Sequence, residues 1–216
     1  MEISYISSEQ NLRQTLIGRT QTKGTIMKIA VVAANGREGQ LVVKEAVERG
    51  HDVTAVVRGD NKTVAKNVVV KDLFNLTAAD LAGFDVVVDA FGAWTPEMLP
   101  QHSSSLKHLC DILSGVNTRL IVVGGAGSLY VNPEHTTQLK DLPTFPAEFK
   151  PLAEAQGKAL EELHERSDVK WTFISPAADF QADGERVGSY ETAGEELTVN
   201  AAGESYISYR SEEHTS

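Results

Sequence analysis

Short apolar runs alternate with amphipathic stretches along most of the chain. The apolar runs predict buried strands over residues 29–33, 51–57, 67–70, 85–89, 119–123 and 170–174. Between them, apolar residues recur at the i, i+3, i+4, i+7 spacing of a helix over residues 37–50, 102–113 and 151–166. Strands that alternate with helices form right-handed crossovers, and therefore a parallel sheet covered on both faces. The pattern thus predicts a single α/β domain with a doubly wound parallel sheet.

The turn after the first predicted strand carries the clearest chemical signal. Gly36 lets the backbone approach a pyrophosphate, and Gly39 lets the following helix pack closely on the strand. The free N–H groups at the start of that helix would face the anion. The first glycine of the usual spacing is replaced by Ala33. This strand, turn and helix predict a dinucleotide site with contacts from Ala33, Asn35, Gly36, Arg37, Glu38 and Gly39.

The residue that follows the second predicted strand bears on which dinucleotide binds. A site specific for NAD carries an acid there for the ribose 2′-hydroxyl, whereas this chain has Arg58. A guanidinium pairs with the 2′-phosphate of NADP in bidentate fashion, and Arg37 in the turn is a candidate second partner. The sequence therefore favours NADP(H) over NAD(H). Two alternatives stay open: both arginines could face solvent, and Asp60 could still reach a ribose.

The other strand ends are further candidates, because doubly wound sheets bind ligands at the carboxyl ends of their strands. For Asp72 a helix cap or turn is an alternative to a contact with adenine, and for Phe91 packing is an alternative to ring stacking. The predicted cofactor contacts at these ends are Asp72, Leu73, Ala90, Phe91, Gly92, Gly125, Ser175 and Pro176.

Composition limits the classes of partner. The 216 residues include 20 Lys and Arg against 30 Asp and Glu, and no basic cluster offers itself to nucleic-acid phosphates. No apolar run approaches the roughly 20 residues that span a bilayer. The single cysteine, Cys110, excludes an internal disulfide and is expected in the core. These features predict a cytoplasmic protein that acts on a small molecule. The six histidines show no ligand-like grouping, so no metal site is predicted, and the oligomeric state stays open.

Both ends of the chain differ from the part between them. Residues 1–26 are polar and lack sustained apolar periodicity, so they are expected to be a non-native or flexible extension. Met27 stands directly before the first predicted strand. Residues 210–216 read like the in-frame translation of a DNA-sequencing adapter. The dinucleotide-binding domain is therefore expected to span residues 27–209 and to be truncated at its C-terminus.

Four segments make the chain resemble the atypical short-chain dehydrogenase/reductase superfamily. Within it, the chain is most similar to the NAD(P)H-binding proteins labelled NADH-flavin reductases, relatives of biliverdin reductase B and of NmrA-like proteins. The resemblance covers about residues 27–209 and implies a Rossmann fold and a nicotinamide cofactor, without fixing the substrate. The segments are Ala33-Ala-Asn-Gly-Arg-Glu-Gly39, Gly124-Gly-Ala-Gly-Ser-Leu129, Trp171-Thr-Phe-Ile-Ser-Pro-Ala-Ala178 and Asp183-Gly-Glu-Arg-Val-Gly-Ser-Tyr190.

The proton-donating pair of ordinary short-chain dehydrogenases is missing from this chain. Those enzymes use a Tyr-x-x-x-Lys pair, and here the residue four before Lys158 is Glu154. Lys158 is thus either a catalytic candidate or a surface lysine. Ser128 is a candidate to hydrogen-bond the acceptor, or it caps a turn. Tyr130 and His135 are candidates to line the pocket.

Hydride transfer to a flavin depends on stacking and short distance more than on a protein acid, and water can supply the other proton. The sequence therefore predicts an NAD(P)H-dependent reductase of flavin or a similar planar acceptor, with flavin as a substrate rather than a bound cofactor. The alternative is a non-catalytic redox sensor of the NmrA-like type, which binds NADP(H) and a protein partner. A nucleotide-sugar epimerase is disfavoured, because it needs the missing tyrosine.

Overall fold

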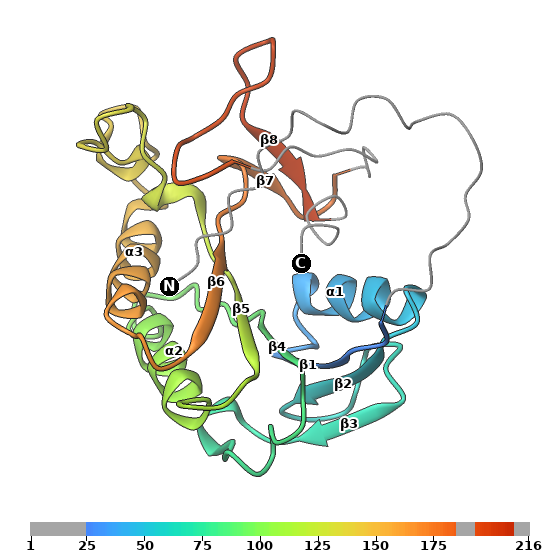
Figure 1. Ribbon diagram of the computed structural model, residues 1–216. Helices are drawn as coiled ribbons and strands as arrows, with labels where there is room; N and C mark the ends of the chain where they lie inside the picture. Colours follow the sequence, from blue (N-terminus) through green and yellow to red (C-terminus); the bar gives the residue numbers. More distant parts are fainter. Residues whose placement is uncertain (1–24, 185–192, 210–216) are drawn as a thin grey trace.

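A six-stranded, all-parallel sheet forms the centre of the molecule. The computed structural model describes residues 25–184 and 193–209. The strand order is β3-β2-β1-β4-β5-β6 (Figure 1). The predicted doubly wound sheet is confirmed, and each predicted strand lies within one residue of its observed bounds. The strands are β1 (Lys28–Val32), β2 (Asp52–Val57), β3 (Asn67–Val70), β4 (Val86–Asp89), β5 (Arg119–Val123) and β6 (Lys170–Ile174).

Helices cover both faces of the sheet. Helix α1 (Arg37–Glu48) packs on one face, and α2 (Gln101–Ile112) and α3 (Lys150–His164) pack on the other (Figure 1). The predicted helix over 37–50 overruns the observed end of α1. Gly50 has a φ of 85°, the left-handed conformation in which a glycine commonly follows the last turn of a helix. Short 3-10 turns are η1 (Leu73–Asn75), η2 (Ala126–Ser128) and η3 (Leu139–Asp141).

Two apolar cores lie between these layers. Alternate residues of each strand point to opposite faces, so Val31 packs toward α1 and Val32 toward α2 and α3. Leu109 and Leu163 fill the second core, and each is at most 1% exposed. Burying one such side chain contributes roughly 1.5–3 kcal/mol. Cys110 also lies in this core, as predicted.

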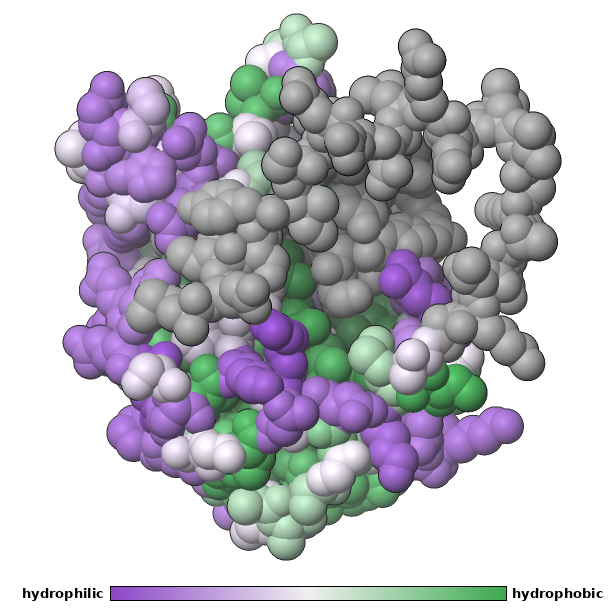
Figure 2. Space-filling model, in the orientation of Figure 1, coloured by the Kyte–Doolittle hydropathy of each residue, from purple (hydrophilic) through white to green (hydrophobic). Residues whose placement is uncertain are grey.

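The connections that follow the carboxyl ends of β5 and β6 lie together at the top of Figure 1. Among them, β7 (Asp179–Gln181) and β8 (Tyr206–Ser208) pair as a second, two-stranded sheet. Figure 2 shows hydrophilic residues over the side of the molecule formed by α2 and α3, as expected for amphipathic helices. None of the described helices has the length and apolar character that a membrane span requires.

Several sequence predictions fall on residues that the structure does not describe. Residues 1–24 of the expected extension and residues 210–216 lie outside the described ranges. The same holds for residues 185–190 of the fourth segment that carried the family resemblance.

Candidate functional site

The turn between β1 and α1 leaves the start of the helix open to a ligand. Ala33 has a φ of 57°, the left-handed conformation that glycine favours at this first position of the pattern. Gly36 N donates to Ala33 O at 2.9 Å and closes the turn. Gly36 is also the N-cap of α1, with no side-chain cap hydrogen bond. Because the first N–H groups of a helix have no partner within it, this end can bind an anion.

The two glycines of the turn have different structural roles. A Cβ on Gly39 would lie 2.8 Å from Ala33 O and 2.9 Å from the Cα of Ala34, so only glycine lets α1 pack this closely on β1. A Cβ on Gly36 would lie 3.2 Å from Ala33 O and 3.9 Å from Ala90 O, so a side chain there would crowd the space between the ends of β1 and β4. A bare backbone cradle beside an uncapped helix start fits the pyrophosphate of a nicotinamide dinucleotide.

Asn35 joins this turn to the segment after β2. Its Nδ2 donates to Asp60 O at 2.9 Å, and its Oδ1 accepts from Lys62 N at 2.8 Å. The Asn35 side chain is thus engaged within the protein. Arg58 follows directly on β2 and is exposed, as is Arg37 at the start of α1. Both guanidinium groups are therefore accessible to a ligand, and both lie at the sheet edge where the sequence predicts the cofactor.

The candidates after β3, β4 and β6 lie at the same edge, because all six strands are parallel. Asp72 accepts from Phe74 N at 2.9 Å and caps η1, which matches the capping alternative. Leu73 is 6% exposed and belongs to the core, so its side chain is not available to a cofactor. Phe91 packs edge-on against His102, with ring centroids 5.8 Å apart. Ala90 and Gly92 flank Phe91, and Ser175 and Pro176 follow β6.

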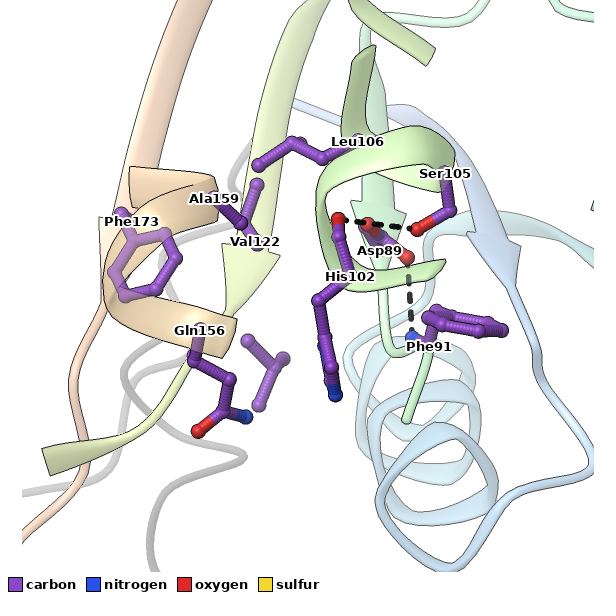
Figure 3. A pocket seen from close by; sticks show the side chains of 11 residues that line it. Asp89, Phe91, His102, Ser105, Leu106, Val122, Gln156, Ala159 and Phe173 are labelled. Carbon is purple, nitrogen blue, oxygen red and sulfur yellow. Dashed lines mark hydrogen bonds between the residues drawn. The ribbon is translucent and has the colours of Figure 1, made fainter. Parts of the chain in front are cut away.

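A recess lies between the carboxyl ends of β4 and β5 and the helices α2 and α3 (Figure 3). We use "the recess" for the pocket whose polar lining residues are Asp89, His102, Ser105 and Gln156. Figure 3 shows the side chains of His102 and Gln156 extending along it from α2 and α3. A Cβ on Gly125 would overlap the Gln156 amide as it stands, so this amide lies directly against the segment that follows β5.

Burial controls the charge of the ionisable groups in the recess. Asp89 is 4% exposed, and burial raises its pKa to about 6, although the hydrogen bond from Phe91 N lowers it in part. Burial lowers the pKa of His102. Its Nε2–H donates to the Ala93 carbonyl oxygen at 3.0 Å. His102 is therefore neutral near pH 7 and holds the segment after β4 in place.

The sequence did not single out Asp89 or Gln156. Asp89 had a usable signal: an acid that ends a run of valines in a buried parallel strand has little access to water. Gln156 lies four residues after Leu152 and three before Ala159. This spacing places it on the inner face of α3. The Tyr-x-x-x-Lys spacing predicted Lys158 instead.

The two catalytic candidates from the sequence do not line the recess. Lys158 lies on the outer face of α3, its side chain is 69% exposed, and its Nζ is 3.7 Å from Glu162. This matches the surface-lysine alternative. Ser128 ends η2, beyond Gly125. Further along, Tyr130 and His135 stack with ring centroids 4.5 Å apart, and neither lines the recess.

The strand order, the glycine turn and the uncapped helix define a dinucleotide-binding protein of the Rossmann type. The chain belongs to the NAD(P)H-binding family, whose model matches residues 33–205. It is 47% identical over 186 residues to the protein YwnB of Bacillus subtilis (strain 168), a match that covers 85% of this chain and 87% of YwnB.

Solved structures agree with this assignment. A protein from Streptococcus pneumoniae TIGR4, named as a proposed NADH-flavin reductase, is 53% identical. It superposes with a TM-score of 0.86 over 88% of this chain and 90% of its own. A protein from Lactobacillus casei is 32% identical, with a TM-score of 0.78 over 88% of this chain and 90% of its own. The Rossmann fold that the resemblance implied is thereby confirmed. The match to the NAD(P)H-binding family supports the nicotinamide cofactor that it also implied.

Proposed function

We propose that the protein is an NAD(P)H-dependent reductase that delivers a hydride to a flavin or a similar planar acceptor. The observation that carries the proposal is the uncapped start of α1, at the same sheet edge as a recess lined by polar groups. A dinucleotide whose pyrophosphate lies at the start of α1 can extend along this edge to the ends of β4 and β5. The similarity to a proposed NADH-flavin reductase supports the oxidoreductase class.

The chain's own residues bind and orient the reactants. When bound, the dinucleotide supplies a hydride from its reduced nicotinamide ring. Gly36 admits the pyrophosphate, and the exposed Arg58 and Arg37 are available to the 2′-phosphate of NADP, which supports a preference for NADP(H). Phe91 and Gln156 border the recess beside which the acceptor stacks. In this proposal the flavin is a substrate that leaves after reduction.

This reductase works without a Tyr-x-x-x-Lys pair. Glu154 is exposed on α3, and Lys158 is exposed beside Glu162, so neither side chain reaches the recess. Orientation and short distance carry most of the rate when a hydride passes between stacked planar rings. The arrangement therefore supports transfer to a flavin better than reduction of an isolated carbonyl, which needs a proton donor held against its oxygen.

A non-catalytic NADP(H)-binding sensor of the NmrA-like type would use the same cofactor site. The test is the loss of NADPH absorbance with FMN or riboflavin as acceptor, together with a fluorescence titration of NADPH binding. The control is Gly36→Val, which should remove both binding and turnover. Multiple turnovers by the wild-type protein support the reductase. Tight binding of NADPH without turnover of either flavin would overturn it in favour of the sensor.

A further inference from the structure

Asp89 is the most deeply buried ionisable side chain that borders the recess, at 4% exposed against 8% for His102. It ends β4 and pairs in register with Val32 of β1 and Val122 of β5, so both of its neighbours in the sheet are apolar. Its Oδ1 accepts the Phe91 N–H at 3.0 Å (Figure 3). A carboxyl group with one hydrogen bond and apolar neighbours favours its protonated form.

None of the other titratable groups that the described structure places near Asp89 stabilises its charged form. On α2, His102 faces the recess and is kept neutral by burial, and burial raises the pKa of the Cys110 thiol to about 11. On α3, the group that lines the recess is the neutral amide of Gln156. In the described part of the chain, no lysine, arginine or second carboxylate lines the recess. Asp89 therefore holds a proton that it can release near pH 6.

The position of Asp89 places this proton next to the reaction. Asp89 is followed directly by the segment Ala90-Phe91-Gly92 and lies beside the β5 end that leads into Gly124. Under the proposed function, the reduced nicotinamide ring and its acceptor meet at these two strand ends. The Ser105 hydroxyl and the Gln156 amide share the recess with Asp89, and together these groups provide the polar partners that a bound water needs.

We infer that Asp89 is the proton donor that completes the reduction of acceptors whose reduced anion is a strong base. This role rests on the proposed reductase function. The acceptor gains a hydride and is reduced, while the dihydronicotinamide is oxidised. A water O–H bond in the recess breaks toward the new anion, and the Asp89 O–H bond breaks toward that water. The electron pair stays on the Asp89 carboxylate, which regains a proton from solvent.

The test compares two acceptors and two variants. Menadione represents acceptors that need the proton, because its reduced anion is a stronger base than that of FMN. Asp89→Asn keeps the shape of the side chain and an oxygen that accepts from the Phe91 N–H, but it removes the acidic carboxyl proton. Asp85→Asn is the matched control, because it makes the same charge change just before the first residue of β4. The Asp85 side chain is exposed and accepts from Lys28 N at 2.8 Å.

We expect Asp89→Asn to slow menadione reduction by about 10²-fold or more at a pH near 6, the cost of a lost general acid. FMN reduction and NADPH affinity should stay within about fivefold, the scale of one hydrogen bond. The wild-type rate with menadione should fall as the pH rises through about 6, because the donor form disappears. The variant should show no such fall, and Asp85→Asn should behave like the wild type.

A readout without turnover checks the proton itself. Infrared titration of the protein alone should show a protonated carboxyl band that disappears above a pH of about 6, is absent from Asp89→Asn and persists in Asp85→Asn. The donor role alone would be overturned if the wild-type protein reduces FMN while Asp89→Asn reduces menadione at the wild-type rate and with the wild-type pH profile. A wild-type protein that reduces neither acceptor would overturn the reductase and the donor role together.

Discussion

Replacing Asp89 by Asn should stabilise the protein at neutral and alkaline pH. The carboxyl has an ordinary pKa of 3.8, and burial raises it to about 6 in the folded state. Folding therefore favours the protonated form, and the folded state loses stability as the pH rises from about 4 to about 6. The full penalty, roughly 3 kcal/mol, is present above about pH 6. Asparagine carries no charge and avoids the penalty, so the two proteins should converge below about pH 4.

Thermal unfolding followed by circular dichroism across this pH range measures the effect. For a chain of this size, roughly 3 kcal/mol corresponds to a rise in Tm of about 6–12 °C at a pH near 8. The control Asp85→Asn changes an exposed side chain and keeps an oxygen that can accept from Lys28 N, so it should change the stability by no more than about 1 kcal/mol. If Asp89→Asn were less stable than the wild type at pH 8, or if its advantage persisted unchanged down to about pH 4, the burial argument would be refuted.

Four further predictions concern the cofactor site, the contact of α1 with β1, and the two catalytic candidates from the sequence. NADPH should bind more tightly than NADH, and Arg58→Glu should narrow or reverse the gap; equal affinities in fluorescence titrations of the wild type would contradict this. Gly36→Val should abolish NADPH binding in an otherwise folded protein. Gly39→Ala should cost about 1–3 kcal/mol of stability in denaturant unfolding, because its Cβ meets backbone atoms; a Gly39→Ala protein of wild-type stability would show that α1 can shift freely. Ser128→Ala and Lys158→Ala should each change flavin reduction by no more than several-fold under saturating NADPH, and a loss above about 10²-fold would reveal a proton donor in one of them.

The sheet could be predicted from the sequence because its signal is local. A parallel strand that is covered on both faces is rich in apolar residues, and each of the six runs has a polar residue or glycine at both ends or within two residues of them. The glycine turn could be predicted for a similar reason, since strand, turn and helix are consecutive. Ala33 stands where the usual turn has its first glycine. The sequence shows a departure from the pattern, and the structure shows that the backbone keeps the left-handed conformation (φ 57°) regardless.

The recess could not be predicted in the same way, because it is assembled from elements that are far apart in the sequence. Asp89 comes from β4, His102 from α2 and Gln156 from α3, and nothing within any one of these segments shows that the three residues meet. Their proximity depends on the order in which the sheet places β4 and β5. The raised pKa of Asp89 depends on the same packing, since the apolar neighbours that exclude water come from β1 and β5.

Lys158 and Gln156 show why motif spacing alone misplaced the chemistry of α3. An α-helix turns by about 100° per residue, so two residues that stand two apart point roughly 200° away from each other. Once the apolar face of α3 directs Gln156 into the recess, Lys158 has to face solvent, where it lies beside Glu162. The polar group that α3 offers to the reaction is then an amide, which neither gains nor loses a proton near neutral pH. An acceptor that needs a proton must obtain it from solvent or from another wall of the recess. The ionisable groups on those walls are His102 of α2, which burial keeps neutral, and Asp89 of β4, whose carboxyl burial keeps protonated up to a pH of about 6.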